Sequence, residues 1–414
     1  MKKVRPALIL VALVLAAGVL SARQAADPIR LGFLVPLSGP SAQSGRDILN
    51  GLLLYLEEIG YRAAGREIQL IVEDDEGIPA VGLTKTRKLV ESDRVHLMAG
   101  ALLSSTGYAL APYIDSMRIP MIYPVVSADD LTQRQRSRWI IRTGWTGSQP
   151  NHAFGEYAYH TLKLRTVATI AFDYAFGWES IGGFQRTFEA EGGRITQKLW
   201  TPISVHDFAP YVAQVSRDVD AVYALFFGRA SLQFLRQYQE YGLKERVLLI
   251  GSGTTTDEHV LPFMGDEAIG VITALHYSAA LDTPANRTYA QAYRARYDKI
   301  PSYYSESMYT GGKWAVAAIE AIDGRVEDRE AFVNALRTVK LTDLPRGPME
   351  LDEYGNPVEN VYIRRVERVN GELQNTVIET FPAVSQFWKY NPADYLREPL
   401  YSRRYVAPGA RSGT

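Results

Sequence analysis

Three consecutive hydroxyl side chains, Ser104, Ser105 and Thr106, lie where a short apolar stretch (95–99) gives way to apolar residues at helical spacing (107–117). The first stretch predicts a buried strand and the second a helix. Free N–H groups and the helix dipole attract anions to a helix N-terminus, and hydroxyl groups add donors there. Ser and Thr are also common helix caps. The sequence therefore allows two interpretations of this stretch: an anion pocket, or a helix cap alone.

Sequence patterns for catalysis and metal binding are missing. None of the six His belongs to an H-E-x-x-H motif, and Ser104 does not lie in a G-x-S-x-G elbow. The glycines of Gly251-Ser252-Gly253 lack the third glycine of a dinucleotide-binding turn. The net charge of −1 gives no indication of a nucleic acid or a membrane surface as partner. We therefore expect a protein that is not an enzyme and needs neither a metal nor a cofactor.

The N-terminus predicts export. Basic residues at Lys2, Lys3 and Arg5 precede an apolar run (6–20), and small residues follow it, as in a secretory signal peptide over residues 1–26. We expect cleavage between Ser21 and Ala26 and a periplasmic location. The chain has no Cys, so an exported protein of this kind depends on a large packed core instead of disulfides, and no lipid anchor can be built on a thiol.

The remaining chain alternates between predicted strands and helices in two series, one before residue 143 and one after it. This alternation predicts an α/β fold with parallel sheets. The predicted strands are 29–37, 68–72, 95–99, 119–126, 167–172, 195–200, 221–227, 247–250 and 271–275, with a hairpin at 361–366 and 376–380 that turns at Asn370-Gly371. The predicted helices include 81–90, 107–117, 149–162, 181–188, 231–241, 258–264, 285–297 and 304–322.

Two such sheets imply two lobes, and ligands of open parallel sheets bind outside the carboxyl ends of the strands. The candidate cleft residues are therefore those that directly follow the strands, namely Ser104, Ser105, Ser127, Phe176, Phe227 and residues 251–254. The end of the chain is rich in Pro, Arg and Tyr, and we expect it to be a surface strap.

Over nearly its whole length after the leader, the chain resembles the periplasmic solute-binding proteins of the branched-chain amino acid type, the receptors of ABC importers. No single motif carries the resemblance; the order and spacing of several do. They are Val35-Pro36-Leu37-Ser38-Gly39-Pro40, Glu73-Asp74-Asp75, residues 100–106, residues 123–128, Ile141-Arg142-Thr143, Leu235-Arg236-Gln237 and Gly242-Leu243.

The resemblance implies the type I periplasmic binding protein fold, in which two Rossmann-like lobes close on a ligand by hinge motion. Lobe one would comprise residues 29–143 and 277–347, and lobe two residues 144–276 and 348–400, with a tail at 401–414. It further implies a small-molecule carboxylate as ligand, the membrane permease of an ABC importer as partner, and a monomer. A ligand sensor on the same fold is the alternative to a transport receptor.

The resemblance also implies roles for individual residues. Ser104 would donate its hydroxyl to the ligand carboxylate and Ser105 or Thr106 a backbone N–H, while Val125 and Ser127 would border the same head group. Ser44 falls where the family often has a Tyr beside the ligand. The apolar surroundings would come from Phe176 and Phe227, which match aromatic positions on the second lobe, with Trp178 and Tyr304.

One departure from the family concerns the ligand. Members that bind amino acids pair the α-ammonium with an acidic residue, and the matching position here is Gly253. A buried ammonium without a partner is costly. We therefore expect a carboxylate with an aromatic or apolar body and no α-amine. Glu306 and Asp173 are alternative ammonium partners, Arg229 is a candidate second anion contact, and a branched-chain amino acid, an amide or urea remain alternative ligands.

Overall fold

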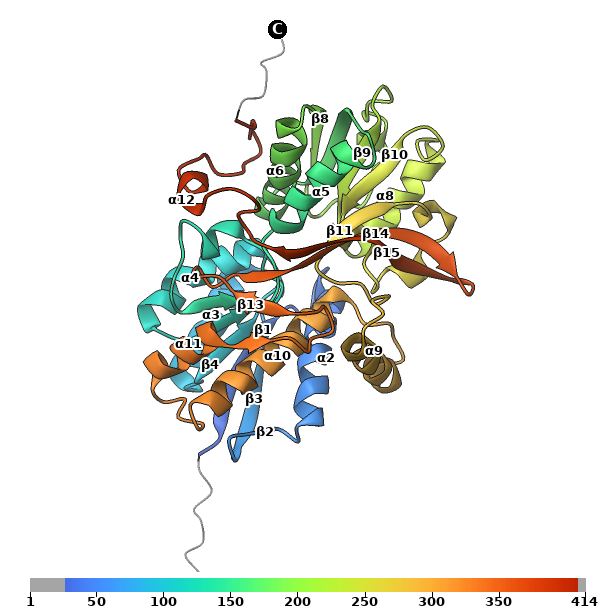
Figure 1. Cartoon of the computed structure of the whole chain (residues 1–414). Coiled ribbons are helices and arrows are strands. Elements are labelled where there is room, and N and C mark those ends of the chain that lie inside the picture. Colours follow the sequence, from blue (N-terminus) through green and yellow to red (C-terminus); the bar gives the residue numbers. More distant parts are fainter. Residues whose placement is uncertain (1–26, 409–414) are drawn as a thin grey trace, which may run out of the picture.

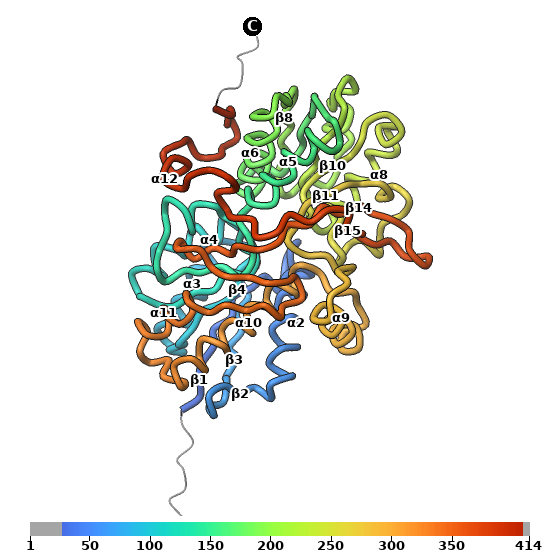
Figure 2. The backbone as a smooth tube through the Cα atoms, viewed as in Figure 1, coloured from blue at the N-terminus to red at the C-terminus, as the bar shows by residue number. Residues whose placement is uncertain are grey.

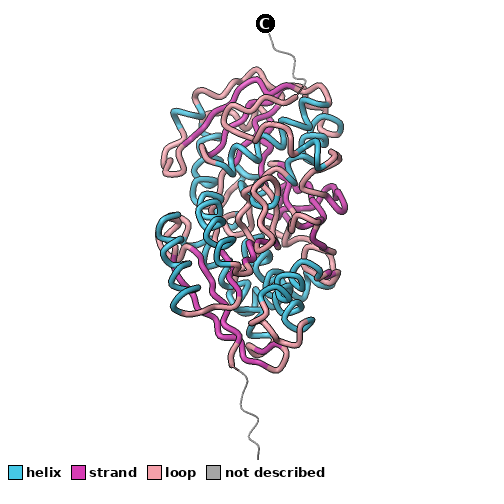
Figure 3. The backbone as a smooth tube through the Cα atoms, turned by 90° about the vertical axis from the view of Figure 1, so that its left-hand side faces the viewer, coloured by secondary structure: helices cyan, strands magenta, loops and turns pink. Residues whose placement is uncertain are grey.

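The computed structural model describes residues 27–408 and contains two β-sheets, each covered by helices (Figure 1). The predicted signal peptide and the last residues of the tail lie outside this range. In Figure 1 the first sheet and its helices occupy the lower half of the molecule, in blue, cyan and orange, and the second occupies the upper half, in green and yellow. The side view in Figure 3 shows the same two halves stacked along the long axis.

The first sheet has six strands in the order β2-β3-β1-β4-β5-β6. All neighbours are parallel except the short edge strand β2. The strands are β1 Ile29–Val35, β2 Arg62–Ala63, β3 Arg66–Asp74, β4 Leu97–Gly100, β5 Met121–Tyr123 and β6 Ile140–Arg142. The helices of this half are α2 Ala42–Glu58, α3 Pro79–Arg87, α4 Ser104–Met117, α9 Pro284–Tyr297, α10 Tyr303–Ala321 and α11 Arg329–Thr338.

The second sheet is parallel in the order β8-β7-β9-β10-β11 and continues through antiparallel strands β14, β13 and β12, with β15 paired to β14. Its strands are β7 Thr166–Phe172, β8 Arg194–Thr201, β9 Ala221–Leu225, β10 Leu248–Ser252, β11 Ile272–Leu275, β12 Lys340–Leu341, β13 Met349–Leu351, β14 Pro357–Val369 and β15 Glu372–Val384. Its helices are α5 Gln149–His160, α6 Ala175–Ala190, α7 Ala209–Val212 and α8 Arg229–Glu240, and α12 Pro392–Tyr395 follows β15.

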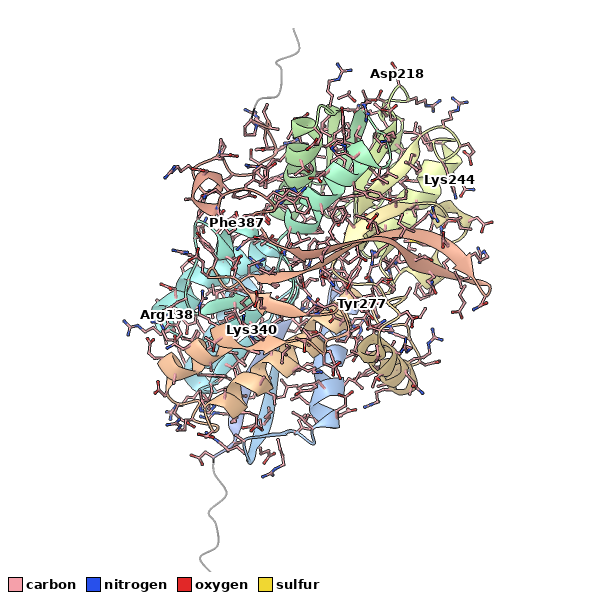
Figure 4. The ribbon with its side chains drawn as sticks, viewed as in Figure 1. Arg138, Asp218, Lys244, Tyr277, Lys340 and Phe387 are labelled. Atoms are coloured by element: carbon pink, nitrogen blue, oxygen red, sulfur yellow. The ribbon has the colours of Figure 1, made fainter. Side chains whose placement is uncertain are left out.

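The chain passes between the halves more than once, as the continuous tube in Figure 2 shows. It leaves the first sheet after β6, returns after β11 to form α9, α10 and α11, and joins the second sheet again at β12. Figure 4 labels Tyr277 at the crossing that follows β11. The returning helix α10 packs closely on α2, where a Cβ at Gly51 would lie 1.9 Å from the Ser305 carbonyl oxygen. A glycine is required there for the two backbones to approach.

The architecture confirms the predicted α/β class with two sheets and a region between them, but several elements differ from expectation. The predicted helix over 258–264 is wrong: only one 3-10 turn occurs there, at Leu261–Phe263. Pro262 has no N–H to donate and breaks the helical ladder. Helix α11 was not expected, and the hairpin strands β14 and β15 are each 13 residues long, which extends well past the predicted ranges.

The end of the chain, residues 385–408, forms a C-terminal strap across both halves. Arg134 of the first half donates to the carbonyl oxygens of Tyr395 (3.0 Å) and Glu398 (2.9 Å). Arg186 of α6 in the second half forms a bidentate ion pair with the Glu398 carboxylate. Figure 4 labels Phe387 in this strap, and in Figure 1 the red segment lies beside α4 and α6.

Candidate ligand-binding site

A small cavity of about 20 Å³ lies between the two sheets, at the carboxyl ends of their strands. A cavity of this volume holds about one water molecule, so the side chains around it must move apart to admit a larger ligand. We call it the aromatic cavity. It is lined by Leu102, Leu103, Ser104, Val125, Ser127, Trp145, Tyr174, Phe176, Phe227, Tyr303 and Tyr304.

The polar end of the aromatic cavity is the start of α4. A sharp turn brings the chain from β4 to this helix: Gly100 has φ +109°, and a Cβ there would lie 2.1 Å from the Leu34 carbonyl oxygen. Ser104 is the first helical residue and is 2% exposed. Its Oγ lies 3.4 Å from the Oγ of buried Ser127. Two hydroxyl groups therefore meet beside the free N–H groups of a helix N-terminus, which is an arrangement that attracts an anion.

The structure also decides how the hydroxyls of this stretch are used. Leu103 occupies the capping position of α4, and no side chain forms a cap hydrogen bond. Ser104 is therefore not a helix cap. Ser105 is half-buried and Thr106 packs towards Gly82 of α3, and neither side chain lines the cavity. Their backbone N–H groups still belong to the first turn of α4, whose donors have no acceptor within the helix.

Aromatic rings form the rest of the wall. Trp145, which follows β6, makes edge contacts with Phe176 (ring centroids 5.4 Å apart) and Tyr303 (6.1 Å). Tyr303 lies against Tyr304 with centroids 4.0 Å apart, and Tyr174 contacts Phe176. The Trp145 Nε1 is buried without a hydrogen-bond partner. The wall of the cavity is thus aromatic and apolar, which suits a flat apolar group, and the Trp145 N–H is buried within it.

No charged side chain lines the aromatic cavity among the described residues. The two alternative ammonium partners have other roles. Glu306 is fully buried and bonded to Arg346, whose Nε lies 2.8 Å from Glu306 Oε2. Asp173 accepts a hydrogen bond from Trp178 Nε1 (2.9 Å) and lies 3.4 Å from Arg403. An ammonium group in this cavity would therefore have no carboxylate partner.

The other predicted site residues lie outside the cavity lining. Ser44 is buried in α2. It acts on the neighbouring Tyr304, because hydrogen bonding by Ser44 and by Tyr303 opposes the increase in the Tyr304 pKa that burial causes. Gly253 starts a 3-10 turn behind the cavity, where its carbonyl oxygen accepts from Arg364 Nη2 (2.7 Å). A Cβ at Gly253 would lie 2.5 Å from the Cβ of Leu275, so the position has no room for an acidic side chain.

Several lining residues were missed by sequence reasoning. Tyr174 directly follows β7, so the rule that selected Phe176 also applied to it. Trp145 follows β6, so the same rule applied to it. Tyr303 begins α10 and follows no strand. Leu102 and Leu103 precede Ser104 in the turn that positions its side chain. An aromatic residue soon after a strand is therefore the signal that would have found Tyr174 and Trp145.

A two-lobed fold with a neutral, aromatic-walled cavity between the lobes is typical of a binding protein that captures a small molecule. The chain belongs to the periplasmic binding protein family, whose model matches residues 28–372. The predicted family and the prediction that the protein is not an enzyme are thereby confirmed. Membership implies an extracytoplasmic location.

Relatives support the same assignment. An ABC transporter substrate-binding protein from Sphaerobacter thermophilus is 36% identical, with a TM-score of 0.83 over 87% of this chain and 99% of that one. A solute-binding protein of an ABC transporter from Rhodopseudomonas palustris BisB5, solved in complex with 3,4-dihydroxybenzoic acid, is 32% identical with the same TM-score, 0.83, and the same coverage, 87% and 99%. The Leu/Ile/Val-binding protein homolog 6 of Brucella melitensis is 27% identical over 364 residues, 86% of this chain and 92% of its own.

The protein is therefore a substrate-binding protein of the ABC transporter type. Within residues 27–408 no helix has the length and apolarity needed to cross a membrane.

Proposed function

We propose that this protein captures an aromatic carboxylate without an α-amine and presents it, as a monomer, to the membrane permease of an ABC importer. The observation that carries the proposal is the neutral lining of the aromatic cavity, which offers an anion site at Ser104 and Ser127 but no partner for an ammonium group. Desolvating an unpaired ammonium there would cost several kcal/mol.

The geometry supports a definite pose. The carboxylate would accept hydrogen bonds from the Ser104 hydroxyl and the first N–H groups of α4, with Ser127 beside them. The ring would lie among Trp145, Phe176 and Tyr303. The hydroxyl groups of Tyr174, Tyr303 and Tyr304 are polar groups in an otherwise apolar wall, and they suit a ring that carries hydroxyl substituents. The dihydroxybenzoate held by the Rhodopseudomonas relative is a ligand of this chemical class.

Both lobes contribute to this pocket. Ser104 and Ser127 come from loops of the first sheet, whereas Phe176 and Phe227 follow strands of the second. A ligand that contacts both sides stabilises the closed arrangement in proportion to its differential affinity for it. Closure around the ring would therefore accompany capture, and the closed form is the one a permease would distinguish from the empty receptor.

Calorimetric titration of the chain without residues 1–26 tests the proposal. We expect benzoate, 4-hydroxybenzoate or 3,4-dihydroxybenzoate to bind. 3-Phenylpropionate and phenylalanine form a matched pair that differs only in the ammonium group, and we expect phenylalanine and leucine to bind far more weakly. Leucine binding as tightly as the best benzoate would instead identify a branched-chain amino acid receptor. Equal affinity for benzamide and benzoate would identify an amide receptor.

A further inference from the structure

Ser307, a residue of α10, contacts the chain at each place where it passes between the two halves. Thr143, directly after β6, has its Oγ1 3.4 Å from the Ser307 carbonyl oxygen. The Ser307 Oγ lies 3.1 Å from Nε2 of His276, directly after β11. The same Oγ accepts an N–H from Nη2 of Arg346 (2.9 Å), in the loop after β12, where the chain has rejoined the second sheet. All four residues are buried.

Arg346 connects this network to both halves of the molecule. Its Nε lies 2.8 Å from Glu306 Oε2 on α10, and its Nη1 lies 2.8 Å from Glu359 Oε2 on β14. Its carbonyl oxygen accepts the Tyr362 hydroxyl (2.6 Å). A guanidinium presents its donors in a fixed plane, so the two carboxyl groups and the Ser307 Oγ are held in one relative arrangement. The network therefore ties α10 of the first half to β14 of the second.

The network also reaches the back of the aromatic wall. The His276 ring contacts two lining residues, Trp145 (ring centroids 5.8 Å apart) and Tyr303 (6.0 Å, edge contact). Burial, with the nearby Arg346 guanidinium, lowers the pKa of His276 well below its usual range, so the ring is neutral. A neutral imidazole packs against other rings without an unpaired charge, and its nitrogen is able to accept the proton of the Ser307 hydroxyl. His276 itself does not line the cavity. Figure 4 labels its neighbour, Tyr277, between the two halves.

We propose that His276 and Ser307 are positioning residues for ligand capture. They hold Trp145 and Tyr303 in place at the aromatic wall and couple these rings, through Arg346, to the passages between the halves. The inference rests on the proposed function, because it concerns the rings that would hold the ligand. Neither positioning residue lines the cavity, so each acts on affinity only through the wall.

The small volume of the aromatic cavity, about 20 Å³, gives this coupling a physical route. A benzoate ring cannot enter unless the wall is displaced. Close-packed side chains transmit such a displacement to their neighbours instead of absorbing it. His276 is a neighbour of both Trp145 and Tyr303, so a movement of either ring reaches the Ser307 hydroxyl and, through it, the passages between the halves.

Labelling the chain without residues 1–26 with 5-fluorotryptophan tests the coupling in the absence of a ligand. The chain has six Trp, and the fluorine NMR signal of Trp145 is identified by its loss in Trp145→Phe. Ser307→Ala removes one buried hydroxyl on the far side of His276, and we expect it to shift the Trp145 signal. Ser231→Ala, which removes an equally buried hydroxyl from α8, is the matched control and should leave that signal in place.

Stopped-flow kinetics with 4-hydroxybenzoate test the effect on capture. We expect Ser307→Ala to raise the dissociation rate constant about 3- to 30-fold and to change the association rate constant less, as is usual for a disturbed binding site. His276→Gln keeps a polar atom for Ser307 but removes the ring that contacts the wall. It should also speed dissociation, and it covers the case in which Ser307→Ala does not fold. Ser231→Ala should change neither rate constant more than about twofold.

A Trp145 signal that keeps its position in Ser307→Ala would overturn the proposal, because the hydroxyl would then have no influence on the wall. Dissociation rate constants that stay within about twofold of wild type in both Ser307→Ala and His276→Gln would also overturn it, as would equal effects of Ser307→Ala and Ser231→Ala. Failure of the wild-type chain to bind 4-hydroxybenzoate would contradict the proposed function instead, and the NMR comparison would still decide whether the network positions the wall.

Discussion

Replacing Ser104 with Ala isolates the contribution of one hydroxyl group to ligand capture. The Ser104 Oγ is buried at the first turn of α4 and has only a long contact, 3.4 Å, to Ser127 Oγ. A hydrogen bond from this hydroxyl to a carboxylate is charge-assisted and contributes about 1.5–3 kcal/mol. At about 1.4 kcal/mol per factor of ten, the dissociation constant for an aromatic carboxylate should rise about 10- to 100-fold.

The same substitution should leave the fold intact. Ser104 does not cap its helix, so the loss of its hydroxyl should lower the free energy of unfolding by less than about 1 kcal/mol. Calorimetric titration with 4-hydroxybenzoate and urea unfolding without ligand separate the two effects. Ser105→Ala is the control, because its side chain lies outside the cavity lining and alanine keeps the backbone N–H.

Two results would refute this reasoning. A dissociation constant that changes less than about threefold in Ser104→Ala would show that the carboxylate does not contact this hydroxyl. Equal weakening by Ser104→Ala and Ser105→Ala would show that the helix start as a whole, and not the Ser104 side chain, determines affinity.

Three further predictions concern stability. Arg346→Met leaves two buried glutamates without their partner, so the free energy of unfolding measured in urea should fall by about 3–5 kcal/mol. A fall of less than about 1 kcal/mol would contradict the structure. Burial raises the pKa of Asp75 to about 6, so the folded state keeps a proton that the unfolded state loses, and the free energy of unfolding falls by about 3 kcal/mol as pH rises from about 4 to 6. Asp75→Asn should remove this fall in urea titrations at several pH values, and a difference between the two proteins that stays constant with pH would exclude it. Gly253→Ala places a Cβ 2.5 Å from that of Leu275 and should cost about 1–3 kcal/mol in thermal unfolding, whereas an unchanged melting temperature would mean that the turn adapts freely.

The site residues that directly follow strands could be predicted from the sequence. Ser104, Ser127, Phe176 and Phe227 come after β4, β5, β7 and β9, and a parallel sheet delivers such residues to one edge. The strands themselves could be predicted because buried parallel strands form continuous apolar runs in the sequence. Local sequence therefore contained enough information for these positions.

The rest of the site depends on contacts between distant segments. Tyr303 begins α10 and reaches the cavity only because the chain returns from β11 to the first half, and no local pattern marks that return. Gly253 also follows a strand, yet its 3-10 turn and the buried guanidinium of Arg364 turn it away from the cavity. The contacts of Ser307 with His276 and Arg346 become visible only when α10 and the passages between the halves are seen together.

The C-terminal strap has a practical consequence for the design of an optical sensor from this protein. Sensors of this kind report the movement of two halves through a fused fluorophore. The strap is bonded to Arg134 of the first half and to Arg186 of the second half. A bulky fluorescent domain fused to the chain after the strap would therefore strain the hydrogen bonds that join the two halves. The exposed hairpin tip at Asn370-Gly371 is an insertion point that leaves the strap untouched, and it carries the label on one half alone.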